Sequence, residues 1–215
     1  QTIMVMDWDD TLFPTTWVRH YMGLHWRYPL EHQPISAMQK TKIKQALDEL
    51  SYEVEAFLRL ALTKGKVVIV TLAKMPWVGL SCQNFFPSIS KLIKENDIGI
   101  VYAQEAELLE DQLPPRGNDP ASQEAYWTRK KQLAISAELE HFYNQYPGQS
   151  WKNVISIGDS NFERRATINS ITSYEHGSLN PSNAPDGTGI DAMCMSGMVG
   201  NHYRKVRAKT IKMYD

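Results

Sequence analysis

The sequence predicts an α/β fold, a Rossmann-like parallel sheet with helices on both faces. Short continuous apolar runs alternate along the chain with segments whose apolar residues recur at spacings of three and four. Such runs are typical of strands buried on both faces of a parallel sheet, and the spaced segments are typical of amphipathic helices. Right-handed crossovers then place helices on both faces. A chain of 215 residues suits one domain spanning 1–215.

In the N-terminal half, the first predicted strand is Thr2–Met6. The segment 13–39 mixes aromatic residues with prolines, so we expect a partly irregular flap with one short helix around Trp17–Leu24. A long helix follows, because apolar residues recur along one face. These residues are Ile43, Ala46, Leu47, Leu50, Val54, Phe57, Leu58 and Ala61. We expect Gly65 to cap this helix, before a second strand at Val67–Val70.

In the C-terminal half, helices and strands continue to alternate until the pattern weakens. The predicted elements are a helix from Pro76 that ends near Leu92 and Ile93, a strand at Ile98–Tyr102, a loop over 112–123, a helix over Ala125–Tyr143 and a strand at Val154–Ile157. From Glu163 onward the sequence is less regular, and we expect an irregular part over 175–203. A last strand is predicted at Lys209–Tyr214.

The composition argues against several classes of function. The formal net charge is −1, so the chain lacks the basic excess of a dedicated nucleic-acid binder and we expect no nucleic-acid partner. No apolar run approaches the roughly 20 residues that span a bilayer. Cys82 and Cys194 lie far apart, so we expect reduced thiols and a cytoplasmic protein, with a single disulfide between them as the alternative. Because Gln1 directly precedes a strand and the last predicted strand runs almost to Asp215, we expect both ends of the chain to be truncated.

Polar residues follow three of the predicted strands. Asp7, Asp9 and Asp10 come directly after the first strand, Thr71 ends the second, and Asp159 follows the strand at 154–157. Ligands bind outside the carboxyl ends of parallel strands, so these side chains are candidates for one site. Closely spaced carboxylates repel one another unless a cation or a proton intervenes. Carboxylate oxygens are hard ligands, and we therefore expect Mg²⁺.

Other interpretations of the acidic cluster fit less well. A calcium-binding loop would place glycine and glutamate where this chain has Leu12 and Val18. The acidic motif of terpene cyclases belongs to large all-helical proteins, whereas this chain is short and has an α/β pattern. A solvated acidic turn would explain the cluster taken alone. It does not explain the three further elements that follow in order along the chain.

Together, four segments resemble the motifs of the haloacid dehalogenase (HAD) superfamily. Residues 6–12 read Met-Asp-Trp-Asp-Asp-Thr-Leu and resemble the first motif, an apolar strand followed by D-x-D-x-T. The strand that ends at Thr71 resembles the second motif, and Lys130 or Lys131 fits the third. Residues 157–163, Ile-Gly-Asp-Ser-Asn-Phe-Glu, resemble the fourth motif. The resemblance covers about three quarters of the chain, from Ile3 to Glu163.

The resemblance implies an Mg²⁺-dependent phosphatase that works through an aspartyl-phosphate. Asp7 would be the nucleophile that attacks phosphorus, and Asp9 would protonate the leaving oxygen and then accept a proton from water. Mg²⁺ would bind Asp7, the backbone carbonyl of Asp9, and Asp159, with Glu163 in direct or outer contact. The Thr71 hydroxyl and one lysine would hold the phosphoryl oxygens.

Two positions depart from the family pattern, and the lysine is ambiguous. Asp10 stands where many members have glycine; its backbone amide can still face phosphate, while its carboxylate adds a negative charge. Glu163 replaces the commoner aspartate and is one methylene longer. We prefer Lys131 over Lys130 as the phosphate-binding lysine, because it precedes Gln-Leu-Ala-Ile in a helical frame.

The spacing of the motifs bears on substrate and partners. It leaves room for a large flap but not for a full cap domain, so we expect a minimal cap and an open site that suits a bulky phosphorylated substrate, such as a phosphoprotein. The aromatic residues of 17–28 either pack between flap and body or recognise a protein partner. A second hypothesis is a non-catalytic HAD-like binding module in a larger protein. Phosphoryl transfer to an acceptor other than water is a third.

Overall fold

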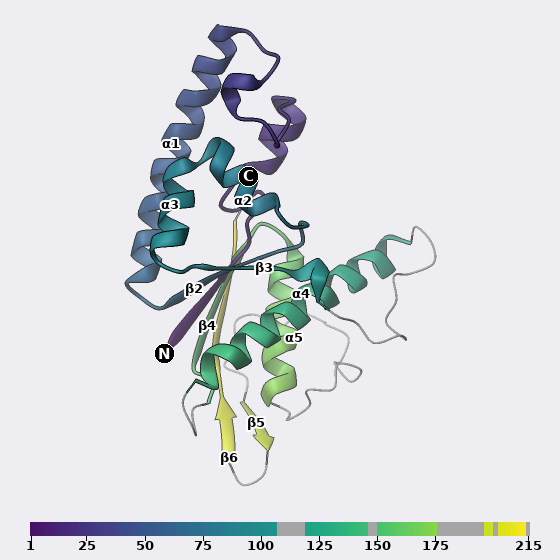
Figure 1. Cartoon of the computed structure of the whole chain (residues 1–215). Coiled ribbons are helices and arrows are strands. Elements are labelled where there is room, and N and C mark those ends of the chain that lie inside the picture. The colour runs from purple at the N-terminus through teal and green to yellow at the C-terminus, as the bar shows by residue number, and fades with distance from the viewer. Residues whose placement is uncertain (107–118, 146–149, 176–195, 200–201, 214–215) are drawn as a thin grey trace.

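The computed structural model describes residues 1–106, 119–145, 150–175, 196–199 and 202–213. Its centre is a five-stranded, all-parallel sheet with the strand order β3-β2-β1-β4-β7 (Figure 1). In that order the strands are Gly99–Tyr102, Lys66–Thr71, Thr2–Met6, Asn153–Gly158 and Arg207–Lys212. The backbone of Ser196–Val199 (β5) and His202–Lys205 (β6) forms a separate antiparallel pair. The predicted α/β, Rossmann-like fold class is confirmed.

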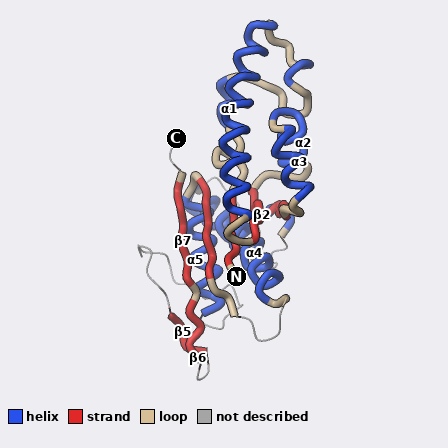
Figure 2. Tube along the Cα trace, turned by 90° about the vertical axis from the view of Figure 1, so that its left-hand side faces the viewer, coloured by secondary structure: helices blue, strands red, loops and turns tan. Residues whose placement is uncertain are grey.

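Helices cover both faces of the sheet. They are Ala37–Leu62 (α1), Trp77–Phe85 (α2), Pro87–Glu95 (α3), Pro120–Tyr143 (α4) and Asn161–Glu175 (α5). In both views α1, α2 and α3 lie together, and α4 and α5 form a second group (Figures 1 and 2). Alternate residues of β1 explain the two layers, because Met4 and Met6 pack with the first group whereas Ile3 and Val5 pack with the second. The central strand is therefore buried on both sides.

The long helix α1 begins earlier than the apolar pattern alone indicates. Ser36 and Gln39 form a capping box, in which the Ser36 side chain accepts from the Gln39 amide and the Gln39 side chain accepts from the Ser36 amide. The buried stripe of the helix is Ile43, Leu47, Ser51, Val54, Leu58 and Ala61. Ala46, Leu50 and Phe57, which we expected on this face, lie at its margin and are exposed.

Gly65 was expected to cap α1, and that expectation was wrong. The C-cap residue is Thr63, in right-handed helical conformation. Gly65 lies in the connection to β2, where a Cβ atom would be 2.3 Å from the backbone oxygen of Thr2. The glycine is needed there because the chain passes directly against the start of β1.

Several other boundaries differ from the expected ones. The predicted helix from Pro76 is two helices, because the chain breaks at Phe86 and Pro87 starts α3. Residues 120–123, expected in a loop, form the first turn of α4, while 112–118 lie outside the described residues. The sequence from Glu163 onward was expected to be less regular, but its first part belongs to α5. The flap at 13–39 contains two short helical turns, Trp17–Tyr21 and Leu30–His32.

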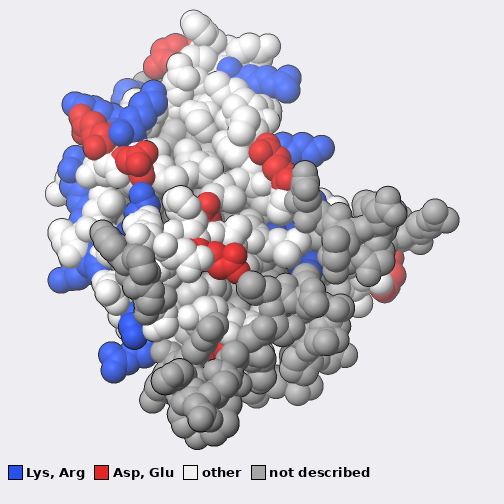
Figure 3. Space-filling view, turned by 60° about the horizontal axis from the view of Figure 1, so that its bottom comes forward, with Lys and Arg blue, Asp and Glu red and all other residues white. Residues whose placement is uncertain are grey.

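The remaining expectations concern the C-terminal part and the surface. Most of 175–203 lies outside the described residues, and the last strand begins and ends two residues earlier than predicted. None of the described helices combines the length and the apolar composition that a bilayer crossing requires. Figure 3 shows a face on which Lys and Arg lie mainly toward the margin and are interspersed with acidic residues, with no continuous basic area on its coloured part.

Candidate functional site

The sheet places the predicted polar residues at one edge. Met6 pairs with Ile69 of β2 and with Ile157 of β4, so the carboxyl ends of these three strands lie within two residues of one another. The Asp7 amide continues the ladder by donating to the Ile157 carbonyl oxygen at 2.9 Å. Thr71 ends β2, and Asp159 directly follows β4. Residues that are far apart in the sequence therefore meet at the carboxyl edge of the sheet, as in other parallel α/β folds.

Three carboxylates converge there. Asp7, Asp159 and Glu163 each place an oxygen within 4.8 Å of the others, and we call them the acidic triad. Asp7 and Glu163 are each only 5% exposed, and Asp159 is partly exposed. Glu163 lies in the first turn of α5, so the turn after β4 carries its carboxylate back over the strand end. The backbone amide and the hydroxyl of Ser160 donate to Oε2 of Glu163 and fix that orientation.

Glycine at position 158 makes this approach possible. A Cβ atom at Gly158 would lie 2.3 Å from Cγ of Glu163 and 2.8 Å from its Oε2. Any side chain at this position would displace Glu163 from the triad. The glycine of the predicted fourth motif therefore has a steric reason that is visible in the structure.

Lys131 of α4 completes the buried cluster. Its ammonium donates to Oδ1 of Asp7 at 2.7 Å and also to Oε1 of Glu163. The side chain is 1% exposed, and its charge is compensated only by carboxylates of the triad among the described contacts. Burial alone lowers the pKa of Lys131, but Asp7 and Glu163 outweigh burial and raise it, so the ammonium form is favoured.

The pKa values of the triad show how its charges are balanced. Burial raises the pKa of Asp7 to about 7, and Lys131 offsets this only in part while Glu163 and Asp9 add to it. Burial, together with Glu163, also raises the pKa of Asp159. For Glu163, burial is opposed by Lys131, and the pKa is lowered. One ammonium thus does not neutralise three carboxylates, and the cluster has an excess of negative charge when ionised.

The acidic triad could hold a metal ion. All its donor atoms are carboxylate oxygens, which suit a hard divalent cation such as Mg²⁺ better than zinc, which prefers nitrogen and sulfur ligands. A bound cation would supply the positive charge that the ionised cluster lacks, and it would lower the pKa of Asp7. The residues present therefore fit the expected metal.

Asp9 lies beside the triad but makes different contacts. Its Oδ1 accepts from the Thr15 hydroxyl at 2.6 Å and from the Trp77 indole N–H at 2.7 Å. Its Oδ2 accepts from the Thr71 hydroxyl at 2.9 Å. The Thr71 hydroxyl in turn accepts from the Ala73 amide at 2.9 Å. The structure thus joins the predicted residues Asp9 and Thr71 directly.

The two other candidates, Asp10 and Lys130, make their hydrogen bonds outside the triad, although the charge of Asp10 adds to the raised pKa of Asp159. Asp10 has a positive φ of 50°, and its carboxylate accepts from the Thr16 amide and hydroxyl at 2.8 and 2.6 Å. Its amide, which we expected to face phosphate, donates instead to the Phe13 carbonyl at 2.8 Å. The Lys130 ammonium donates to the carbonyls of Gln104 and Ala106 and so ties α4 to the chain after β3. Of the two lysines, Lys131 is the one that reaches Asp7.

Sequence reasoning missed Trp77, Thr15 and Ser160. Trp77 follows Thr71 by six residues, and nothing in their spacing indicates that its indole would turn back to Asp9. Thr15 lies in the first part of the flap, and no pattern in the sequence indicates that its hydroxyl would donate to Asp9. Ser160 could have been found, because a serine three residues before a glutamate is the sequence signature of a helix start.

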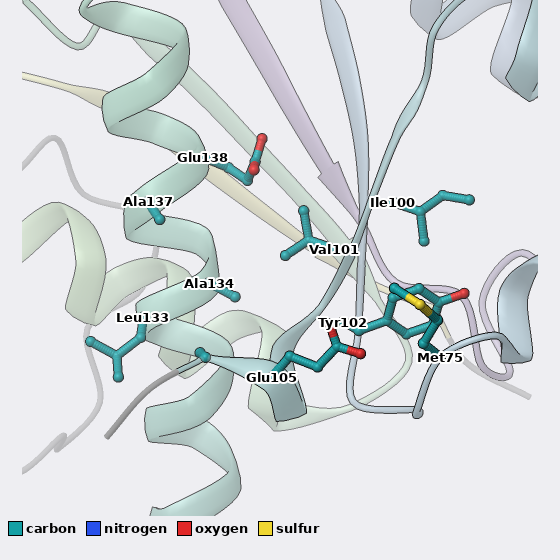
Figure 4. Close-up of a pocket in the computed structure, with 10 residues that line it drawn as sticks. Met75, Ile100, Val101, Tyr102, Glu105, Leu133, Ala134, Ala137 and Glu138 are labelled. Atoms are coloured by element: carbon teal, nitrogen blue, oxygen red, sulfur yellow. The ribbon is translucent and has the colours of Figure 1, made fainter. Parts of the chain in front are cut away.

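An open hollow of about 480 Å³ lies between the outer strand β3 and α4. Figure 4 shows Met75 and Tyr102 next to each other on one side of it and Leu133 of α4 on the other. Tyr102, which lines the hollow, pairs with Thr71 across β3 and β2, whereas no residue of the triad lines it.

Comparisons with known proteins add no family. No family model matches the chain, and no curated protein and no solved structure matches it significantly.

Proposed function

We propose that the protein is an Mg²⁺-dependent phosphatase of the HAD type, with Asp7 as the nucleophile. The observation that carries the proposal is the acidic triad, in which Asp7, Asp159 and Glu163 place oxygens within 4.8 Å of one another. A buried lysine on Asp7 and a threonine hydroxyl on Asp9 complete the set of groups that this chemistry needs. Residues 1–215 would then form one HAD-like domain with a flap over 13–39.

Mg²⁺, held by the triad and the backbone carbonyl of Asp9, would screen the charge of the phosphoryl group from the carboxylates. Lys131 occupies Oδ1 of Asp7, so we assign Oδ2 as the attacking atom. It forms a bond to phosphorus while the bond to the leaving oxygen breaks. Lys131 and the Thr71 hydroxyl are the groups that would hold phosphoryl oxygens in place.

Asp9 would transfer the protons of both steps. It gives a proton to the leaving oxygen as the first phosphorus–oxygen bond breaks, and it thereby becomes a carboxylate. In the second step this carboxylate accepts a proton from the water that attacks the aspartyl-phosphate. The bond between phosphorus and Asp7 then breaks, which releases inorganic phosphate and restores both residues.

We further propose a bulky substrate, such as a phosphorylated protein side chain. The support is the hollow of about 480 Å³ between β3 and α4, because Tyr102, one of its lining residues, is the strand partner of Thr71. Met75, next to the hollow, is 61% exposed, so apolar surface is available to a substrate there.

The test is turnover of 4-nitrophenyl phosphate with and without Mg²⁺, in the natural chain and in Asp7→Asn. We expect activity that requires Mg²⁺ and is lost in Asp7→Asn, because an amide oxygen does not form the acyl-phosphate. Asp48→Asn is a matched control, since Asp48 is an exposed carboxylate of α1 that pairs with Lys44. Full activity of Asp7→Asn would exclude Asp7 as the nucleophile.

A second measurement separates an enzyme from a binding module. Fluoroberyllate with Mg²⁺ mimics an aspartyl-phosphate, so we expect it to raise the melting temperature of the natural chain but not that of Asp7→Asn. Absence of both turnover and this thermal shift would contradict the proposed function and favour a non-catalytic module.

A further inference from the structure

The carboxylate of Asp9 accepts three side-chain hydrogen bonds, two on Oδ1 and one on Oδ2. Two donors from different parts of the chain meet on Oδ1: the indole N–H of Trp77 at 2.7 Å and the hydroxyl of Thr15 at 2.6 Å. We propose that Trp77 and Thr15 are positioning residues, which fix Asp9 so that its Oδ2 exchanges the proton with the leaving group. This inference rests on the proposed function and adds two residues to it.

Trp77 is itself rigidly placed. It is 6% exposed and begins α2, and its ring makes edge-to-face contacts with Phe13 at 5.9 Å and Trp26 at 5.3 Å between centroids. The guanidinium of Arg19 lies 5.9 Å from the ring centroid. Edge-to-face and cation–π contacts of this kind hold a ring in one orientation. The indole N–H therefore has a fixed direction, and Asp9 is the acceptor it meets.

The chemistry of the donors decides between the two oxygens of Asp9. An indole N–H can only donate, so Oδ1 must act as an acceptor whenever this hydrogen bond is present. Oδ2 faces the Thr71 hydroxyl, which can either donate or accept. When Oδ2 carries the proton, the Thr71 hydroxyl is free to turn toward a phosphoryl oxygen. The same protonation state of Asp9 therefore allows Oδ2 to give up its proton and the Thr71 hydroxyl to bind phosphate.

A purely structural hydrogen bond would give the same geometry, so the test must respond to proton transfer. General acid catalysis matters most when the leaving group is a poor one. We would measure kcat/KM, which reports the steps up to formation of the aspartyl-phosphate, for 4-nitrophenyl phosphate and for phenyl phosphate. The variants are Trp77→Phe, which keeps an aromatic ring and removes the N–H, and Thr15→Val, which removes the hydroxyl at a partly exposed position.

Trp151→Phe is the matched control. Trp151 is also buried, at 2% exposure, but it stacks on Tyr174 and belongs to the core on the other face of the sheet. We expect Trp151→Phe to change kcat/KM for both substrates by the same small factor. In Trp77→Phe and Thr15→Val, kcat/KM for phenyl phosphate should fall about 10-fold more than kcat/KM for 4-nitrophenyl phosphate. This difference is smaller than the roughly 10²–10⁴-fold that general acid catalysis usually contributes to the rate, because the variants misplace Asp9 without removing it.

Equal losses with both substrates, or no loss, in a folded Trp77→Phe protein would overturn the inference while leaving the proposed function intact. If Trp77→Phe does not fold, Thr15→Val decides, because its hydroxyl donates to the same oxygen from outside the core. No turnover by the natural chain with either substrate would overturn the proposed function and this inference together.

Discussion

At the scale of single residues, the raised pKa of Asp7 leads to a prediction about metal binding. Burial raises its pKa to about 7, so in the absence of a cation this carboxyl is largely protonated below pH 7. A metal ion must displace that proton before it can bind. We therefore predict that the affinity for Mg²⁺ falls by up to about tenfold for each pH unit below 7 and levels off above it.

Isothermal titration with Mg²⁺ between pH 5.5 and pH 8.5 measures this dependence. Proton release on binding, obtained from titrations in buffers of different ionisation enthalpy, should be largest at the low end of the range. An affinity that stays constant from pH 5.5 to pH 8.5 would mean that Asp7 is not a ligand that must first lose a proton.

The candidate site could be predicted in part from single residues. Asp7, Thr71, Asp159 and Lys131 each stand at or beside a strand end or in a helical frame, where topology alone brings them together. Asp10 and Lys130 share those sequence positions, yet their side chains face the flap and the chain after β3. Which of two adjacent residues faces a site depends on local backbone dihedrals and helix phase, and a single sequence determines these only weakly.

At the scale of elements, the connection from α1 to β2 is a point of close packing. A Cβ atom at Gly65 would lie 2.3 Å from the backbone oxygen of Thr2, and that oxygen cannot move without shifting β1. We predict that Gly65→Ala lowers the free energy of unfolding by about 1–3 kcal/mol, the usual cost of overpacking. Urea denaturation followed by circular dichroism measures it.

Gly79→Ala is the control for this prediction. Gly79 lies inside α2, and a Cβ atom there would meet nothing within 4 Å. Alanine in a helix interior is favoured over glycine by about 0.5–1 kcal/mol, so Gly79→Ala should be neutral or stabilising. Equal stability of Gly65→Ala and Gly79→Ala would show that the approach of Gly65 to Thr2 is not a constraint.

The elements that the sequence predicted well and those it did not differ in a physical way. β1, β2 and β4 consist mainly of consecutive apolar residues. In a chain that alternates with amphipathic helices, such short runs are typical of strands buried on both faces of a parallel sheet. α5 was missed because its buried face includes Glu163, Thr167, Ser170 and Glu175, which are polar and therefore do not produce an apolar periodicity. The face of α5 that packs inward is thus partly set by the chemistry of the site.

At the scale of the whole molecule, the site depends on elements from both halves of the chain. β1 and β4 are neighbours in the sheet although about 150 residues separate them, and α4 and α5 pack against each other on one face. Lys131 of α4 and Glu163 of α5 meet Asp7 over the end of β1. A cation on the acidic triad would therefore link the first strand to the fourth strand and its following helix.

This arrangement predicts that Mg²⁺ stabilises the fold as a whole. A ligand that binds only the folded state adds about 2.7 kcal/mol at 100 times its dissociation constant. We expect a Mg²⁺-dependent rise in melting temperature, measured by differential scanning calorimetry, that is lost in Asp159→Asn. Glu95→Gln is the control, because Glu95 is an exposed carboxylate of α3 and its replacement leaves the triad intact. If Mg²⁺ shifts the melting temperature of Asp159→Asn as much as that of the natural chain, the cation binds elsewhere.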